Sequence, residues 1–278
     1  MMTRDICGGL LRSAGIRPDK NLGQNFLCDQ SVIDTIVDAV GAGPDDTVVE
    51  IGCGIGALTV GLCKAAGRVI GIELDTRVLP VLEERLRPYP NQRIINADAL
   101  EADFSSFGGN IKVVGNLPYY ITTDLMKRIF AAHSCVSDVT VMMQTEVAAK
   151  VTAKPGKDGY GLLSLMAEYC GDTRVVTDVE GSCFFPPAPV RSTVLHIDIL
   201  PEPRVQAEDE QKLFRFIKDA LLLRRKTLPN SLAAAGYCGG DKAAISRMLT
   251  EAGIEPTVRA EKLSLAQLAE LSRIFSKK

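Results

Sequence analysis

Short β-rich runs alternate with helical segments from residue 31 to residue 199, and this alternation limits the possible folds more than any other feature of the chain. The β-rich runs are expected at residues 47–51, 68–72, 93–96, 111–115, 139–143, 173–179 and 193–199. Helical patterns are expected at residues 31–40, 57–66, 76–87, 122–133, 144–153 and 160–169. Strands that alternate with helices of this length predict an α/β fold, in which helices cover both faces of a parallel sheet. Because no helix separates the last two runs, we expect them to add a hairpin to a seven-stranded sheet.

The pattern changes at Pro201-Glu-Pro-Arg, which has the composition of a linker. Only helical periodicity follows, over residues 209–224, 240–252 and 264–275. We therefore expect two domains: residues 1–200, with the sheet and an N-terminal arm, and residues 201–278, with a small all-helical fold. The second part holds 14 Lys and Arg against 10 Asp and Glu, whereas the first holds 18 against 24. A basic helical domain would suit phosphate groups, although a solvated helical surface explains the same charges and is favoured on charge alone.

Cysteine and histidine usage argues against a metal site or a disulfide framework. The eight cysteines are scattered without any CxxC pair, and only His133 and His196 are present. We expect reduced, buried thiols, a structural role for His196, and no metal.

No apolar run approaches the roughly 18 residues of a membrane span, and the patch at residues 6–11 is too short for a signal peptide. The expectation is a monomeric, cytoplasmic protein that has no membrane partner.

Three glycines follow the first β-rich run, in the segment Glu50-Ile-Gly-Cys-Gly-Ile-Gly. Glycine lets the backbone approach a ligand closely, because no Cβ stands in the way. In a parallel sheet this turn lies at the carboxyl ends of the strands, where ligands bind. The signal is weak by itself, because Gly52, Gly54 and Ala57 also satisfy the dinucleotide-binding pattern G-x-G-x-x-A.

Acidic residues close the next two strands of the predicted sheet. Glu73 can accept hydrogen bonds from ribose hydroxyls, as in both NAD and S-adenosylmethionine sites, although a surface acid at a strand end is the plain alternative. Asp98 can accept a hydrogen bond from an adenine amino group. Glycines and acceptors from three successive strands favour S-adenosylmethionine, because the sequence shows no clear second site for a pyrophosphate and a nicotinamide.

The sharpest motif is Asn116-Leu-Pro-Tyr, at the end of the fourth β-rich run. The N6 amine of adenine is a poor nucleophile, since its lone pair is delocalised into the ring. The amine could donate two hydrogen bonds, one to the Asn116 side-chain oxygen and one to a backbone carbonyl held by Pro118, that of Leu117. Tyr119 or Tyr120 could stack on an extruded base. Asn-x-Pro is also an ordinary turn signal, but its place after a glycine loop and two strand-end acids favours the catalytic interpretation.

Seven segments together resemble the KsgA/RsmA family of small-subunit ribosomal RNA adenine N6-dimethyltransferases. They are Gly23-Gln-Asn-Phe-Leu, Val49-Glu-Ile-Gly-Cys-Gly-Ile-Gly-Ala-Leu-Thr, Gly71-Ile-Glu-Leu-Asp, Asn96-Ala-Asp-Ala, Gly115-Asn-Leu-Pro-Tyr-Tyr, Phe184-Phe-Pro-Pro and Arg224-Arg-Lys-Thr-Leu. The resemblance implies a Rossmann-like class I methyltransferase sheet, followed by a small C-terminal helical domain that binds rRNA. It also implies that the chain uses S-adenosylmethionine to dimethylate two adjacent adenosines near the 3′ end of 16S rRNA, in the assembling small subunit.

The resemblance also implies roles for individual residues. Cofactor contacts fall on Asn25, Leu27, Gly52, Glu73, Asp98 and Asn116. Contacts with the target base fall on Asn116, Leu117, Pro118, Tyr119 and Phe184. Of these, Phe184 would stack on the base face opposite the tyrosine. From the residues alone, Phe184 and its neighbour Phe185 fit the core or a loop anchor equally well.

The chain departs from the family pattern at three positions. Cys53 stands where the family often has proline, and Pro189 and Arg191 replace a lysine and an aspartate. The last two departures bear on local rRNA contacts and not on the chemistry. Three other functions compete: a large-subunit rRNA adenine methyltransferase of the erythromycin-resistance type, a non-catalytic RNA-binding assembly factor, and an NAD oxidoreductase. The segments at residues 23–27 and 224–228 favour the small-subunit branch.

Arg224, Arg225 and Lys226 end the helical pattern that begins at residue 209. Basic residues at a helix C-terminus complement the helix dipole, which stabilises the fold by roughly 0.3–1 kcal/mol per charge. The same run would bind rRNA phosphates with a strong salt dependence. Both explanations are open at this point, and they are compatible.

Overall fold

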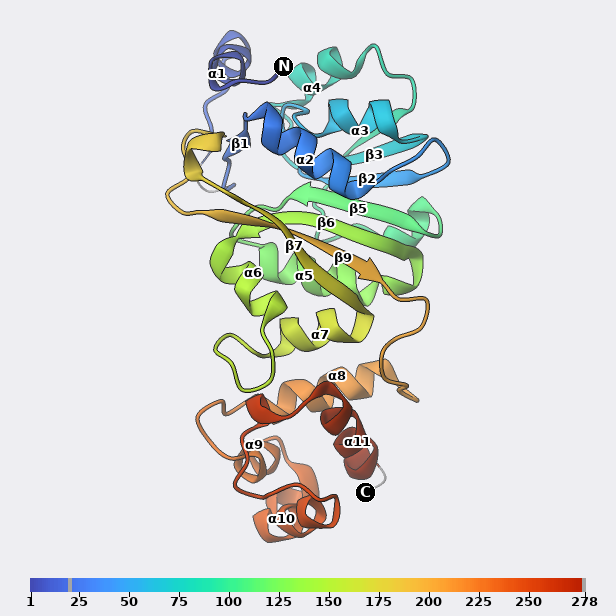
Figure 1. Ribbon diagram of the computed structural model, residues 1–278, viewed down its shortest axis with the longest axis vertical. Helices are drawn as coiled ribbons and strands as arrows, with labels where there is room; N and C mark the ends of the chain where they lie inside the picture. The colour runs from blue at the N-terminus through green and yellow to red at the C-terminus, as the bar shows by residue number, and fades with distance from the viewer. Residues whose placement is uncertain (20–21, 277–278) are drawn as a thin grey trace. The chain divides into compact units, whose positions relative to one another are not determined.

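Figure 1 shows the computed structural model, which describes residues 1–19 and 22–276. The chain divides into two compact units. One contains Met1–Ala148 and Gly171–Pro201, and the other contains Ala149–Cys170 and the chain from Glu202 onward. The first unit ends near the expected boundary, but residues 149–170, which the sequence pattern placed with the sheet, group with the C-terminal helices.

Long-range contacts explain this grouping. The Tyr160 side chain is fully buried, and its hydroxyl donates a hydrogen bond to the Leu263 carbonyl over 3.0 Å. Arg224 Nη2 donates to the Tyr160 carbonyl over 3.2 Å. Both contacts join segments far apart in the sequence, so helical periodicity around Tyr160 gave no indication of them.

The first unit is built on a seven-stranded sheet, as expected. The strand order is β4-β3-β2-β5-β6-β9-β7. The strands are β2 (Thr47–Ile51), β3 (Arg68–Glu73), β4 (Gln92–Asn96), β5 (Ile111–Asn116), β6 (Val136–Gln144), β7 (Gly171–Val179) and β9 (Ser192–Ile199). Strands β2 to β6 are parallel, whereas β9 pairs antiparallel with both β6 and β7. The predicted α/β sheet with an added hairpin is therefore confirmed.

Alternating strand residues show that both faces of this sheet are covered. Val48 and Val49 point to opposite faces, because successive side chains in a strand alternate. Neither is exposed to solvent, and Val113 and Val114 of β5 behave in the same way. Near-continuous apolar runs such as Thr47-Val-Val-Glu-Ile are typical of strands buried on both sides.

In the part of the chain that the structure describes, six α-helices belong wholly or partly to the first unit. They are α1 (Arg4–Ser13), α2 (Gln30–Val40), α3 (Thr59–Ala65), α4 (Leu79–Leu86), α5 (Thr122–Ala131) and the start of α6 (Thr145–Thr152). Helix α2 begins at Gln30, where the Asp29 side chain caps it by accepting hydrogen bonds from the Ser31 and Val32 amides. It ends at Gly41, which adopts the left-handed conformation with φ of 56°.

The strand order reverses beside β2. The chain runs from β2 outward to β3 and β4, and then returns to place β5 on the other side of β2. The carboxyl ends of β2 and β5 therefore face a crevice between the two halves of the sheet. Ligands of open α/β sheets bind at such a switch point. Figure 1 shows β2 and β5 side by side at the centre of the sheet.

The second unit is helical. Its helices are α7 (Leu162–Cys170), α8 (Glu210–Ala220), α9 (Leu228–Ala234), α10 (Lys242–Glu251) and α11 (Leu265–Ser276). Phe216 of α8 and Phe275 of α11 stack with their ring centroids 5.8 Å apart, and Tyr237 meets both rings edge-on. Helix α8 ends at Ala220 and not at residue 224, so the basic run 224–226 lies beyond the helix.

Several elements were not expected from the sequence. These are α1, α9, and a two-stranded sheet in which β1 (Phe26–Leu27) pairs antiparallel with β8 (Phe184–Phe185). Short 3-10 turns occur at Phe104–Phe107, His133–Cys135, Gly181–Cys183, Tyr237–Gly240 and Ala260–Lys262. Within the described residues, none of the helices combines the length and apolar character that crossing a membrane requires.

Candidate active site

A cleft of about 990 Å³, including its part open to solvent, lies at the carboxyl ends of β2 to β5. Residues 22–27, called the N-terminal segment below, form one of its walls. Nine of the ten residues expected at the site line this cleft: Asn25, Leu27, Gly52, Glu73, Asp98, Asn116, Leu117, Pro118 and Tyr119. The tenth, Phe184, does not. The fold therefore collects residues that are up to 94 positions apart, from Asn25 to Tyr119, around one volume.

The glycine turn after β2 forms the floor of the cleft. Gly52 and Gly54 have φ of 74° and 54°, in the left-handed region where a side chain is strained. A Cβ on Gly54 would lie 3.2 Å from the Phe26 ring, which is tighter than normal packing allows. Glycine is therefore favoured here both by backbone conformation and by the close approach of the N-terminal segment.

Glu73, the last residue of β3, is buried beside this turn. Its Oε2 accepts from the Gly54 amide over 2.7 Å, and its Oε1 accepts from the Asp75 amide over 2.8 Å. Burial raises the pKa of Glu73, and the two amide donors oppose that shift. Each carboxylate oxygen has a second lone pair, so Glu73 can still accept from ligand hydroxyls.

Asp98 lies after β4, where the sequence predicted it. Its Oδ1 accepts from the Leu100 amide over 2.8 Å, which fixes the carboxylate at the cleft wall. The second oxygen can accept from a ligand amino group.

The charge of the lining indicates which ligands fit. Among the described residues that line the cleft, Glu50, Glu73 and Asp98 are acidic, and none is Lys or Arg. A pyrophosphate would meet acidic side chains and no basic one among these residues, which argues against a dinucleotide. A sulfonium cation with an attached adenosine suits the three acids, the apolar Leu27 side chain and the open glycine turn. The residues present therefore fit S-adenosylmethionine.

Asn116 ends β5 and faces the cleft from the opposite side. Its Nδ2 donates to the Asn25 backbone carbonyl over 3.1 Å. A carbonyl can only accept a hydrogen bond, so this contact determines which end of the Asn116 amide is nitrogen. The Oδ1 atom is thereby left to accept a hydrogen bond from a ligand.

The backbone carbonyls that follow Asn116 differ in their partners. The Pro118 carbonyl accepts from the Ile121 amide at 3.2 Å and from the Thr122 hydroxyl at 2.8 Å, which closes the turn into α5. The Leu117 amide donates to the Met142 carbonyl over 3.0 Å, anchoring the motif to β6. Because the Pro118 carbonyl is engaged, the Leu117 carbonyl is the better second acceptor.

Two tyrosines follow the motif. The Tyr119 hydroxyl is hydrogen-bonded to Ser192 Oγ over 2.9 Å, so its ring is held at the cleft. Burial raises the pKa of Tyr119, which keeps the phenol neutral. Tyr120 also lines the cleft, but about half of its surface is exposed. Tyr119 is the better fixed platform for stacking.

Phe184 lies outside the cleft. It pairs with Leu27 in the β1–β8 sheet, and its side chain is fully buried in the hydrophobic core. The expected stacking of Phe184 on a base therefore has no support from its position, because it is buried and does not line the cleft. The sequence left core and base-stacking roles equally open, and burial favours the core.

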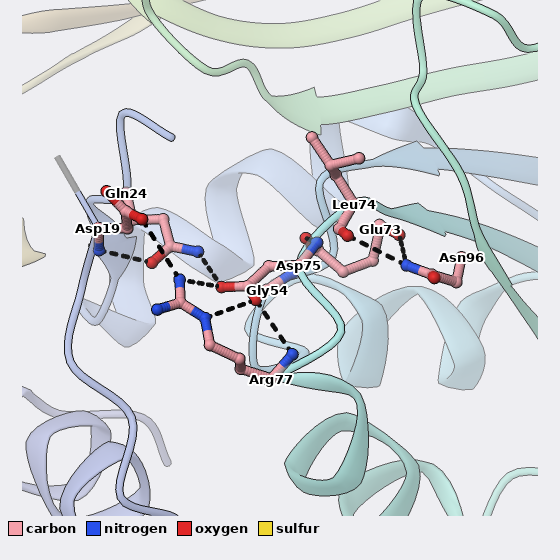
Figure 2. A network of polar contacts seen from close by, with 8 residues as sticks. All are labelled: Asp19, Gln24, Gly54, Glu73, Leu74, Asp75, Arg77 and Asn96. Carbon is pink, nitrogen blue, oxygen red and sulfur yellow. Dashed lines mark hydrogen bonds and ion pairs between the residues drawn. The ribbon is translucent and has the colours of Figure 1, made fainter. Parts of the chain in front are cut away.

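A polar network around Glu73 contains residues that were not expected at the site (Figure 2). Asn96 Nδ2 donates to the backbone carbonyls of Glu73 and Leu74, at 2.8 and 3.1 Å. Gln24 Nε2 donates to Asp75 Oδ2 over 2.7 Å. Gln24, Asp75 and Asn96 belong to segments that carry the family resemblance, but their spacing in the sequence predicted no role for them.

Comparison with known proteins agrees with this geometry. Residues 17–277 match the family model described as ribosomal RNA adenine dimethylase. "Ribosomal RNA small subunit methyltransferase A" of Shouchella clausii is 42% identical over 271 residues, which cover 95% of this chain and 91% of that protein. The protein of the same name from Pelotomaculum thermopropionicum is 40% identical over 278 residues, with coverage of 96% and 94%.

Solved structures share the fold. A dimethyladenosine transferase from Plasmodium falciparum superposes with a TM-score of 0.77 at 23% identity, covering 91% of this chain and 98% of the other. The 23S rRNA methyltransferase ErmE superposes with a TM-score of 0.69 at 25% identity, covering 91% and 100%. These two likenesses are to the fold, whereas the family follows from the sequence match along almost the whole chain. The chain therefore belongs to the ribosomal RNA adenine dimethylase family.

Proposed function

We propose that this chain transfers methyl groups from S-adenosylmethionine to the N6 amines of two adjacent adenosines near the 3′ end of 16S rRNA, during assembly of the small ribosomal subunit. Family membership and the small-subunit methyltransferases at about 40% identity support the substrate class. The orientation of Asn116 is the observation on which the chemistry depends. Its amide nitrogen is hydrogen-bonded to the Asn25 carbonyl and the residue lines the cleft, so its oxygen would be available to a base amine that meets a methyl donor there.

The chemical problem is the low nucleophilicity of the adenine amine. Two acceptors aimed at its N–H bonds favour a tetrahedral nitrogen, and they release the lone pair from the ring. Asn116 Oδ1 and the Leu117 carbonyl would supply these acceptors, and the Pro118 ring would keep the backbone in place. The amine becomes acidic as it is methylated, so no strong base is needed before transfer. Positioning and electrostatics would provide the catalysis.

The Tyr119 ring would stack on the extruded base. The hydrogen bond to Ser192 would hold the ring in one orientation, and burial raises the pKa of Tyr119, which favours the neutral phenol. A stacked base loses its freedom to rotate away from Asn116. Phe184 is buried in the core and does not line the cleft, so we assign stacking to Tyr119.

The cofactor residues would act on the other side of the cleft. Bound S-adenosylmethionine supplies a methyl group on an electrophilic sulfonium carbon. Glu73 would accept from the ribose hydroxyls and Asp98 from the adenine amino group, while Gly52 leaves room for close backbone approach. Asn25 and Leu27 would cover the ligand from the N-terminal segment. These contacts would orient the methyl group toward Asn116.

Methyl transfer to unmodified ribosomal subunits tests the proposal. Purified protein is incubated with labelled S-adenosylmethionine and small or large subunits, and nucleosides are analysed by mass. Dimethyladenosine in two adjacent positions of 16S rRNA is expected. Label in large-subunit RNA, or monomethyladenosine alone, would contradict the proposed function. The absence of any transfer would favour a non-catalytic assembly factor.

Replacing Asn116 tests its proposed role. Asn116→Ala should lower kcat by about 100-fold or more, as when one preorganised polar contact to a reacting group is removed. The fold should persist, because the substitution removes a single part-buried hydrogen bond. Asn91→Ala is a matched control, since the Asn91 amide also donates to backbone carbonyls but lies outside the cleft. Full activity of Asn116→Ala would refute the assignment.

A further inference from the structure

We propose that Asp75 is a positioning residue that holds the N-terminal segment over the cleft through Gln24, and that this contact sets the affinity for S-adenosylmethionine. The inference rests on the proposed function, because it assumes that the cleft binds this cofactor. Neither side chain has a role in the chemistry described above. The network is drawn in Figure 2.

The Gln24 amide uses both of its ends. Its Nε2 donates to Asp75 Oδ2 over 2.7 Å, and its Oε1 accepts from the Asp19 amide over 2.8 Å. The Gln24 backbone amide also donates to the Asp19 carbonyl over 3.1 Å. Gln24 therefore bonds to Asp19 and ties the N-terminal segment to the loop after β3. A hydrogen bond to a carboxylate is among the stronger single contacts of this kind.

Asp75 is held in place by Arg77. Oδ1 of Asp75 accepts from the Arg77 amide at 3.0 Å and from its Nε at 2.8 Å, and Oδ2 accepts from Nη2 at 2.7 Å. Only 5% of the Asp75 side chain is exposed. Hydrogen bonds from Arg77, and then from Gln24, lower the pKa of Asp75. The carboxylate is thus a charged, immobile acceptor for Gln24.

The backbone amide of Asp75 contacts Glu73, the acid proposed to bind the cofactor ribose. The Asp75 backbone amide donates to Glu73 Oε1 over 2.8 Å, while Glu73 Oε2 accepts from Gly54. One residue therefore orients Glu73 through its backbone and anchors Gln24 through its side chain. Figure 2 labels the residues of this chain of contacts, from Asp19 to Gly54.

The segment is also attached on the far side of the cleft. The Asn25 carbonyl, one residue after Gln24, accepts from Asn116 Nδ2 over 3.1 Å. Residues 24 and 25 thus connect the loop after β3 with the end of β5. A segment that is already held in this position does not have to be ordered when the ligand binds, and this raises affinity.

The first test compares two glutamines with the same bonding pattern. Gln24→Met keeps the side-chain length and removes both amide contacts. Gln30→Met is the matched control, because Gln30 Oε1 accepts from the Met2 amide and its Nε2 donates to Asp34. Calorimetry should show about a tenfold higher Kd for S-adenosylmethionine with Gln24→Met and a wild-type Kd with Gln30→Met. The loss should appear in the KM for the cofactor and much less in kcat.

A charge exchange gives a second variant pair. Gln24→Glu places a carboxylate against Asp75 and should weaken cofactor binding more than Gln24→Met. Adding Asp75→Asn should restore much of the affinity, because an amide at position 75 can donate to the carboxylate introduced at position 24. A merely structural role for Asp75 would make the double variant worse than either single one.

Hydrogen exchange of the cofactor-free protein provides a readout independent of activity. Amides 22–28 should exchange faster in Gln24→Met than in the wild type, and they should be unchanged in Gln30→Met. Wild-type Kd and wild-type exchange in Gln24→Met would overturn the inference, as would equal weakening by Gln30→Met. A wild-type protein that fails to bind S-adenosylmethionine would instead overturn the proposed function.

Discussion

Carboxylates that line or adjoin this cleft experience different environments. Asp75 meets an arginine and a glutamine amide, which lower its pKa. Glu50, in β2, is fully buried, and burial raises its pKa to about 7, with the nearby Glu73 charge adding to the shift. Glu50 Oε2 and Thr59 Oγ1 have no hydrogen-bond partner among the described residues. Titration of Glu50 should therefore make the stability depend on pH.

Replacing Glu50 by glutamine should change the pH dependence of stability. The folded chain keeps a proton on Glu50 up to about pH 7, whereas the ordinary pKa of 4.5 applies when it is unfolded. Titration of Glu50 therefore makes its whole contribution to the free energy of unfolding below pH 4.5. That contribution decreases as the pH rises from 4.5 through 7. The loss amounts to roughly 3 kcal/mol, at about 1.36 kcal/mol per pKa unit.

Urea denaturation of the cofactor-free protein between pH 5 and 8 measures this effect. Wild-type stability should decline more steeply with pH than that of Glu50→Gln. Glu84→Gln, which removes a negative charge from an exposed side chain, is the control. Parallel profiles for wild type and Glu50→Gln would show that Glu50 does not titrate in this range.

At the scale of the element, α1 and the β1–β8 pair support the N-terminal wall of the cleft but lack a clear sequence signal. Helix α1 contains Gly8-Gly9, and glycine lowers helix propensity. Its formation follows from packing, because Cys7 and Leu11 are buried in the core. Thr3 also caps it by accepting from the Ile6 amide. Strands β1 and β8 have two residues each, which is too short for the alternation of apolar and polar residues to identify them.

The two glycines of α1 should respond differently to alanine. A Cβ on Gly9 would meet no atom within 4 Å, so Gly9→Ala should raise the unfolding free energy by about 0.5–1 kcal/mol. A Cβ on Gly8 would lie 3.1 Å from the Phe185 ring, so Gly8→Ala should raise the unfolding free energy by less than Gly9→Ala, or should lower it. Denaturation midpoints in urea distinguish them. Equal effects at both positions would mean that α1 does not pack on Phe185 in solution.

At the scale of the whole molecule, the charge is divided unevenly along the chain. The net charge is −2, while the part from Pro201 onward has the excess of basic residues. Helix α8 ends at Ala220, and residues 222–226 are exposed beyond it. A helix dipole acts mainly within the last turn, so it does not account for the basic run at 224–226. Contact with rRNA phosphates is the better explanation of the two.

Removing two of these charges should weaken binding to the small subunit. Arg225→Ala with Lys226→Ala spares Arg224, which donates to the Tyr160 carbonyl. The slope of log affinity against log salt should fall by about 2, because each phosphate that is no longer neutralised accounts for about 0.9. The affinity for S-adenosylmethionine should not change.

A charge-matched variant controls for the removal of two positive charges. Lys212→Ala with Lys218→Ala removes the same charge from the exposed side of α8. Filter binding over a range of salt concentrations should show a smaller change in slope for this control. Equal slopes for the two double variants would indicate a general effect of charge and no specific contact by the basic run.

The order of the elements along the chain was largely predictable from the sequence, because local patterns carry that information. Apolar runs indicated the seven strands, and the glycines after the first strand indicated the turn. Glu73 and Asp98 were singled out by their places at strand ends. The Asn116-Leu-Pro-Tyr motif was identified by its place after a strand. Residues 149–170 were assigned to the wrong unit, since only the long-range contacts of Tyr160 with the C-terminal helices determine where they pack.

The sequence by itself determined the fold class, the family and the residue types available for chemistry. Tertiary structure decided how those residues meet: which end of the Asn116 amide faces the cleft, how Gln24 reaches Asp75 across 51 positions, and why Phe184 lies in the core. It also decided the pKa of Glu50, which depends on how completely the surrounding elements exclude water. The physical reason is the same in each case. Propensity and spacing act between neighbours in the chain, whereas burial and hydrogen bonding depend on partners that only folding brings into contact.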